Sequence, residues 1–198
     1  KIIEKIKELI NNGYKITLFY NLGILYDYPG SYEKYEKEKI DQSINTNFLS
    51  IIKMDKELLE NNINIDTIYT VSISAFYRGE WDYLYQISKS ALKSYIETLI
   101  VDDIKNKRNR RIIALFPDTI KTGEEGMGAK LKDYPKIPGE LYVKEVINII
   151  KGKYKYIGYI FEIDNNKIKL YGINPSKITG AFEYNEKEFI KELGEAIY

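Results

Sequence analysis

The feature that most constrains the fold of this chain is the alternation of short apolar segments with longer stretches of helical periodicity. The apolar segments are rich in Ile, Thr and Tyr and cover residues 15–20, 67–74, 111–116 and 156–163. Runs of this length and composition are typical of buried strands. Strands that alternate with helices of ten or more residues form βαβ units. We therefore predict an α/β fold with a doubly wound, mainly parallel sheet and helices on both of its faces.

The remaining elements can be placed by periodicity and by turn residues. Helices are predicted over residues 2–10, 32–61, 83–105, 139–151 and 185–197. The sequence Asp164-Asn165-Asn166 separates the last apolar segment from residues 167–172, which predicts a C-terminal hairpin before the final helix. Residues 117–139 contain four Gly and three Pro and are predicted to be a long irregular loop, of a kind that often has a functional role.

The absence of His and Cys excludes several classes of functional site. No Ser-His-Asp or Cys-His nucleophile, no disulfide and no thiolate or imidazole metal site can form. A general acid or base must then be Asp, Glu, Lys or Tyr. The net charge of +1 creates no overall attraction for nucleic acid or an anionic membrane, and no apolar run approaches the roughly 18 residues of a membrane span. We therefore predict a cytoplasmic protein that binds neither nucleic acid nor membranes.

A Tyr/Lys pair at the start of a predicted helix is the strongest candidate for chemistry. Tyr85 and Lys89 are four residues apart and so share one face of the helix over 83–105. They follow a β-branched segment that ends in Ser72 and Ser74. With 19 Tyr in the chain such pairs also arise by chance, and Tyr35/Lys39 is a second one, predicted to lie in a solvated, charged helix. The strand and the serines that precede Tyr85 distinguish the first pair from the second.

Five segments in a fixed order resemble motifs of the short-chain dehydrogenase/reductase family. They are TLFYNLGIL (17–25), INTNFLSII (44–52), TVSISAF (70–76), YQISKSAL (85–92) and FPDTIKT (116–122). The resemblance implies a Rossmann-like fold, with residues 1–163 as a catalytic core that lacks the first strands of the family, and residues 164–198 as an extension of the same domain. It also implies a homo-oligomer, dimer or tetramer, in which the helices over 32–61 and 83–105 pack against a second subunit.

The resemblance implies an oxidoreductase that uses NAD or NADP to interconvert a small-molecule carbonyl and a secondary alcohol. Its catalytic residues would be Asn47, Ser72, Tyr85 and Lys89, with Ser74 as the alternative serine. Its cofactor-binding residues would be Asn21, Gly23, Tyr85, Lys89, Pro117, Thr119, Ile120 and Thr122. A free phenol has a pKa of about 10, whereas an acid–base catalyst works best near about 7. We therefore expect the Lys89 cation to lower the pKa of Tyr85.

Two departures from the family pattern leave a second interpretation open. The glycine-rich turn that binds the pyrophosphate of a dinucleotide should precede residue 17, and it is not found there. Asp118 also stands where the family has Gly. We expect the turn to lie in a longer chain; the alternatives are that another chain supplies it or that the nucleotide site is lost. In the last case the protein would be an inactive scaffold or binding subunit.

Overall fold

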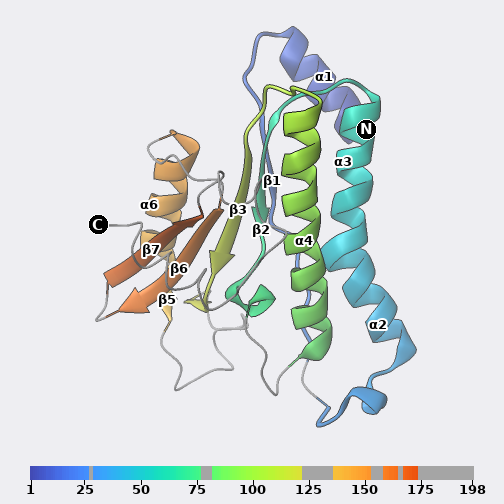
Figure 1. The fold of residues 1–198 in the computed structure, drawn as a ribbon, viewed down its shortest axis with the longest axis vertical. Coiled ribbons are helices and arrows are strands. Elements are labelled where there is room, and N and C mark those ends of the chain that lie inside the picture. Colours follow the sequence, from blue (N-terminus) through green and yellow to red (C-terminus); the bar gives the residue numbers. More distant parts are fainter. Residues whose placement is uncertain (27–28, 77–81, 122–135, 153–157, 165–166, 174–198) are drawn as a thin grey trace.

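Parallel strands of the predicted kind form the centre of the structure, a computed structural model that describes residues 1–26, 29–76, 82–121, 136–152, 158–164 and 167–173. The main sheet has the order β1–β2–β3–β6–β7 (Figure 1). Its strands are β1 (Thr17–Tyr20), β2 (Asp66–Thr70), β3 (Ile112–Pro117), β6 (Gly158–Asp164) and β7 (Lys167–Ile173). The first four are parallel, and β7 is antiparallel to β6, so the predicted parallel sheet and C-terminal hairpin are both confirmed.

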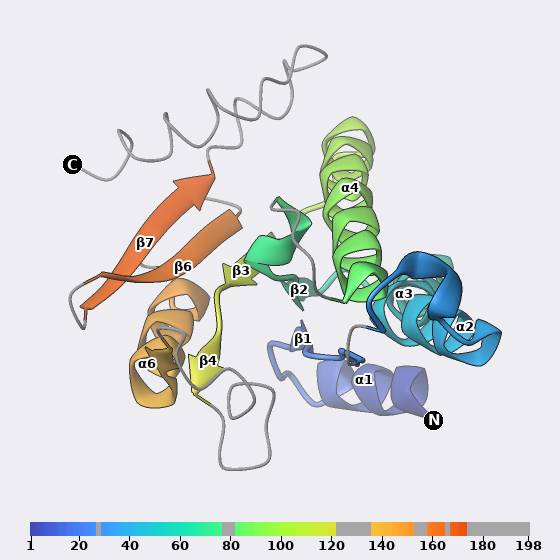
Figure 2. The same cartoon turned by 90° about the horizontal axis from the view of Figure 1, so that it is seen from below.

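Helices cover both faces of this sheet, as predicted for a doubly wound fold. Figure 2 shows α6 on the opposite side of the strands from α3 and α4. The helices are α1 (Ile2–Asn11), α2 (Lys37–Ile44), α3 (Ser50–Glu60), α4 (Tyr83–Lys105) and α6 (Gly139–Ile150). Because side chains alternate along a strand, Tyr69 packs into the core beneath α3 and α4, while Ile68 packs beneath α6. None of the helices described is both long and apolar enough to cross a membrane.

The helix predicted over 32–61 is not continuous. Residues Tyr32–Lys34 form a 3₁₀ turn, α2 begins only at Lys37, and a π-helical turn at Asn45–Leu49 separates α2 from α3. The prediction that Tyr35 lies in a solvated helix is wrong. Tyr35 is buried between the 3₁₀ turn and α2, where its hydroxyl donates to Asp82. Charged neighbours in the sequence concealed this contact, because Asp82 is 47 residues away.

The loop predicted over 117–139 contains a small second sheet. Strand β4 (Ile120–Lys121) pairs in parallel with β5 (Ile137–Pro138), and β5 leads directly into α6. Two-residue strands are too short to leave a periodic signal in the sequence. The predicted helix over 185–197 and the predicted cofactor residue Thr122 lie outside the described residues.

The basic segment after α4 forms ion pairs. Arg110 donates from Nε and Nη2 to Asp103 at 2.6 and 3.0 Å, and its side chain has no exposed surface. Arg111 binds Asp66 at the start of β2 through its main-chain nitrogen and its guanidinium. The segment therefore connects the end of α4 to the amino ends of β2 and β3.

We expect the Asp103–Arg110 pair to be important for stability. Asp103→Ala would leave a buried guanidinium without its carboxylate, which typically costs about 3 to 5 kcal/mol. The matched control is Glu60→Ala, which breaks an exposed ion pair with Lys56 and should cost about 1 kcal/mol or less. Urea unfolding followed by circular dichroism measures both values. Equal losses in the two variants would contradict the structural importance of the buried pair.

Candidate active site at the carboxyl edge of the sheet

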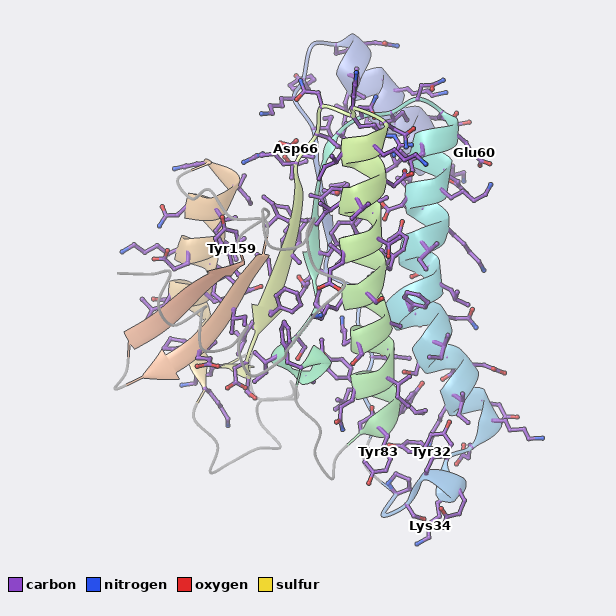
Figure 3. All side chains as sticks on the ribbon, in the orientation of Figure 1. Tyr32, Lys34, Glu60, Asp66, Tyr83 and Tyr159 are labelled. Carbon is purple, nitrogen blue, oxygen red and sulfur yellow. The ribbon has the colours of Figure 1, made fainter. Side chains whose placement is uncertain are left out.

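Tyr85 lies in the first turn of α4. The helix begins here because the carboxylate of Asp82 accepts from the main-chain nitrogens of Leu84, at 3.0 Å, and Tyr85, at 3.3 Å. Such a cap satisfies donors that have no partner within the helix. Figure 3 shows the neighbouring Tyr83 at the opposite end of the molecule from Asp66, which begins β2. The first turn of α4 is therefore at the edge where the parallel strands end.

Ser72 is the serine that reaches Tyr85. The Ser72 hydroxyl lies near enough to the phenol of Tyr85 to lower its pKa. Ser74 contacts Ser72 instead, because its hydroxyl and its main-chain nitrogen donate to Ser72 Oγ at 2.6 and 3.1 Å. With its oxygen already accepting from Ser74, the hydroxyl proton of Ser72 is available for Tyr85. Of the two serines that the sequence left open, the geometry favours Ser72.

The amine of Lys89 is buried at the ends of two strands. Its Nζ donates to the carbonyl of Thr70, the last residue of β2, at 2.9 Å, and to the carbonyl of Leu22, just after β1, at 3.3 Å. The side chain is 1% exposed, and this burial lowers its pKa to about 8. The amine also lies 5.4 Å from the centre of the Tyr85 ring. Lys89 and Tyr85 are therefore adjacent, as their spacing predicted.

The expected lowering of the Tyr85 pKa by Lys89 is not found in this structure. Burial raises the pKa of Tyr85 to about 12, the nearby Asp82 carboxylate adds to the increase, and the hydrogen bond with Ser72 opposes it. The reason is geometric: Lys89 Nζ is directed at two main-chain carbonyls and lies near the ring of Tyr85. The sequence spacing placed the two residues together, but it could not show which atoms of Tyr85 face the ammonium.

Asn47 lies in the π-helical turn and forms hydrogen bonds with the segment after β1. Its Oδ1 accepts from Ile24 N at 2.7 Å, and its Nδ2 donates to Ile24 O at 2.9 Å and to Ser88 Oγ at 3.0 Å. π-Turns are often found at functional sites. Asn47 is fully buried, so its amide positions other groups. Ser88 in turn donates to the carbonyl of Tyr85 at 2.9 Å, which connects Asn47 to the Tyr85 main chain.

The predicted cofactor-binding residues fall into two groups along the carboxyl edge. Asn21 and Gly23 are exposed just after β1. A side chain at Gly23 would begin 3.6 Å from Lys89 Nζ and 3.9 Å from Asn47 Oδ1, so the backbone passes close to both residues. Pro117, Thr119 and Ile120 follow one another at the end of β3 and the start of β4.

A cluster centred on a buried carboxylate lies beneath the site, and the sequence analysis missed it. Asp55 accepts hydrogen bonds from the hydroxyls of Tyr20, Tyr69 and Tyr95 at 2.6, 2.8 and 2.9 Å. Burial raises the pKa of Asp55, and the three hydrogen bonds act in the opposite direction. Tyr20 is the last residue of β1, and Tyr69 is the next to last residue of β2. The cluster therefore joins α3 and α4 to the strands that lead into the site. No sequence signal linked these residues.

Two further hydroxyls near the site also escaped the sequence analysis. Thr70 Oγ1 and the hydroxyl of Tyr142, in the first turn of α6, are buried and make no well-formed hydrogen bond within the described part of the chain, and they lie near enough to interact with each other. Burial raises the pKa of Tyr142 to about 12; the Thr70 hydroxyl opposes this increase and Tyr85 adds to it. Buried hydroxyls normally have partners, so this pair could take a polar group of a ligand.

Comparison with known proteins identifies the fold. The sequence matches no family model and no curated protein. A short-chain dehydrogenase from Burkholderia cenocepacia J2315 in complex with NADP aligns with a TM-score of 0.63 over 94% of this chain and 74% of its own, at 15% identity. 4-Hydroxyisoleucine dehydrogenase complexed with NADH gives 0.59 over 82% and 74%, at 19% identity. A short chain dehydrogenase family protein from Francisella tularensis gives 0.52 over 73% and 54%, at 24% identity.

These likenesses show that the chain has the fold of short-chain dehydrogenases, which confirms the Rossmann-like α/β architecture. The chain spans between about half and three quarters of the length of these structures. Identities of this size show a common fold and leave activity open.

The burial of Lys89 predicts a specific pH dependence of stability. Between pH 8 and the ordinary lysine value of 10.5, the unfolded chain holds a proton that the folded chain has released. The free energy of unfolding must therefore rise with pH in this interval. We expect the difference between wild type and Lys89→Met to grow by about 3 kcal/mol across it, measured by urea unfolding. The exposed Lys53→Met is the matched control, and a flat wild-type minus Lys89→Met difference would contradict the prediction.

Proposed function

We propose that this protein is an NAD- or NADP-dependent oxidoreductase that interconverts a carbonyl and a secondary alcohol of a small molecule. The observation that carries the proposal is the assembly of Ser72, Tyr85 and Lys89 at one edge of a sheet with the fold of short-chain dehydrogenases. The three residues come from a strand end and a helix start, and their order in the chain is the order that the resemblance implies.

Tyr85 would exchange the proton in this reaction. In reduction, a hydride adds to the carbonyl carbon and the phenol gives its proton to the oxygen; in oxidation both transfers reverse. The Ser72 hydroxyl, which lies beside the phenol of Tyr85, would hold the substrate oxygen there. The nicotinamide supplies or accepts the hydride when it is bound.

Lys89 would support this exchange from one helical turn away. A charged ammonium 5.4 Å from the Tyr85 ring centre favours the phenolate, and the positive charge of an oxidised nicotinamide would do the same. In this structure burial raises the pKa of Tyr85 to about 12, with no lowering by Lys89. The proposal therefore requires that bound cofactor, together with Lys89, lower the pKa of Tyr85 into the working range.

The residues present suit one end of the cofactor. The close approach of the Gly23 backbone to Lys89, together with the buried hydroxyls of Thr70 and Tyr142, offers polar contacts for a nicotinamide and its ribose. We propose Asn21, Gly23, Lys89, Pro117, Thr119, Ile120 and Thr122 as cofactor-binding residues, with Tyr85 at the reacting end. The described residues include no glycine-rich turn between a strand and a helix that would take the pyrophosphate.

A second candidate function is that of an inactive scaffold with the same fold. Asp118, which stands where the family has Gly, favours it. The side chain of Asp118 accepts from Thr119 N at 2.6 Å, and its main-chain nitrogen donates to Phe161 O at 2.9 Å, so Asp118 fixes the end of β3 against β6. The two functions differ in one measurable property, the binding of NADH or NADPH.

We also propose a homo-oligomer, dimer or tetramer, formed through α4. The outer face of this helix carries an uncharged stripe, with Ile87 48% exposed, Val101 48% exposed and Ser94 and Thr98 between them. On a chain with 30% charged residues, an uncharged face with exposed Ile and Val side chains is typical of a surface that packs against protein.

The enzyme proposal predicts that Tyr85→Phe retains the fold and loses turnover by about a hundredfold to ten-thousandfold. Oxidation of NADH and NADPH with a panel of ketones measures turnover, and fluorescence titration measures nucleotide binding. Tyr14→Phe, at an exposed tyrosine far from the site, is the matched control. Equal turnover in wild type and Tyr85→Phe would contradict the role of the phenol. A wild-type protein that binds neither nucleotide would instead favour the scaffold.

The oligomer proposal predicts that Val101→Glu reduces the mass measured by light scattering to that of a monomer, because a buried carboxylate without a partner is costly. Val143→Glu, at an exposed apolar residue of α6, should leave the mass unchanged. A wild-type protein that is monomeric at micromolar concentration would contradict the proposal.

A further inference from the structure

The carboxylate of Asp82 does more than cap α4. It is 2% exposed, and its Oδ1 accepts from Leu84 N and Tyr85 N, the two contacts that a cap requires. Two more donors come from far along the chain. The hydroxyl of Tyr35 donates to Oδ1 at 3.1 Å, and Tyr26 N donates to Oδ2 at 2.7 Å.

Tyr35 also contacts the start of α4, through both Asp82 and Tyr83. While its hydroxyl donates to Asp82, its oxygen accepts from Tyr83 N at 3.1 Å. The first turn of α4 is thus held by two side chains, one at its start and one before α2. Figure 3 shows Tyr83 and Tyr32, which lies in the 3₁₀ turn before Tyr35, at the same end of the molecule.

The segment after β1 is held at every second residue. Lys89 binds the carbonyl of Leu22, Asn47 binds both main-chain atoms of Ile24, and Asp82 binds the nitrogen of Tyr26. Asn47 and Lys89 belong to the proposed active site, and Asp82 extends the same pattern by one more contact. The first turn of α4 and this segment are therefore fixed relative to each other.

We infer that Asp82 is a positioning residue for the proposed reaction: it sets the place of the Tyr85 phenol by joining the first turn of α4 to the segment after β1. The inference rests on the proposed function. Asp82 does not contact substrate in this account; it acts through Tyr85. A shift of about 1 Å in a reacting group can cost about a hundredfold in rate, so a side chain that fixes this turn can control turnover.

Asp82 also acts on Tyr85 through its charge. The groups that face Tyr85 are Ser72 from the end of β2, Tyr142 from α6, and Asp82 and Lys89 from α4. Among these, the Asp82 carboxylate raises the pKa of Tyr85. A change at Asp82 should therefore alter both the geometry and the titration of the phenol, whereas a residue that only stabilises the helix would leave the titration unchanged.

Asp82→Asn separates these effects from capping. Asn is as good a cap as Asp, so the helix start is retained. Its amide places an N–H group where Tyr26 N needs an acceptor, and it removes the charge. We expect the Tyr85 pKa to fall, because the Asp82 carboxylate raises it, and kcat to fall by about tenfold or more with little change in KM, because displacement of the phenol outweighs the gain from its lower pKa. Asp82→Ser, a second good cap, should give the same directions. Asp102→Asn, near the other end of α4, is the matched control.

The Tyr85 pKa is measured by NMR on protein labelled at the tyrosine Cζ, with Tyr85→Phe used to assign the signal. A lower pKa in both Asp82 variants but not in Asp102→Asn, accompanied by the loss in kcat, supports the inference. A wild-type pKa or a wild-type kcat in folded Asp82→Asn overturns it. If wild type itself has no turnover, the proposed function fails; the pKa measurement then decides on its own whether Asp82 acts on Tyr85.

Discussion

The amine of Lys89 lies between two main-chain carbonyls, one at the end of β2 and one just beyond β1. A buried ammonium is tolerated only where its donors are satisfied. The two carbonyls must therefore stay within hydrogen-bonding distance of the same nitrogen, and this fixes the spacing of the two chain segments at the edge of the sheet. The backbone of Gly23 passes close to Lys89, and Asn47 hydrogen-bonds to Ile24, and both contacts depend on that spacing.

The Asp55 cluster supports the same edge from inside the core. Tyr20 and Tyr69 bind Asp55, and each lies one or two residues before a carbonyl that accepts from Lys89, that of Leu22 or that of Thr70. The rings of Tyr20 and Tyr69 also stack, with their centres 4.9 Å apart. The hydrogen bonds to Asp55 in the core and those of Lys89 at the edge of the sheet therefore fix the same two strand ends. Asp82 adds the contact that brings the start of α4 into it.

Much of the fold could be predicted because its signals are local. Four parallel strands, the hairpin and the helix at 83–105 follow from periodicity and turn residues, and the last was placed at its observed bounds. The interruption of the helix over 32–61 was missed because the part before the π-turn, α2, has too few apolar residues to reveal a shift of one residue in the hydrophobic spacing. Strands β4 and β5 were missed because two residues are too short to show a period.

The site was predictable where motif spacing fixes neighbours along a helix or strand, as for Tyr85 with Lys89. It was not predictable where atoms meet across the fold. The buried position of Tyr35, the acceptors of Lys89 and the three phenols around Asp55 all depend on contacts between residues 14 to 67 positions apart. The enclosure of Arg110 with Asp103 was equally unpredictable, because nothing in the sequence marks a partner seven residues earlier.

The π-turn at Asn45–Leu49 has a consequence for the two helices that it joins. Each residue turns an α-helix by about 100°, so one additional residue in a turn rotates everything after it by that angle. Buried residues recur at four-residue steps across this turn, at Ser43, Asn47, Ile51 and Asp55. In a regular α-helix each such step would move the buried side round the axis by about 40°, so Ser43 and Asp55 would lie about 120° apart. The wider π-turn offsets much of this drift, so that one side of the two helices presents both Asn47 to the edge of the sheet and Asp55 to the phenols beneath it.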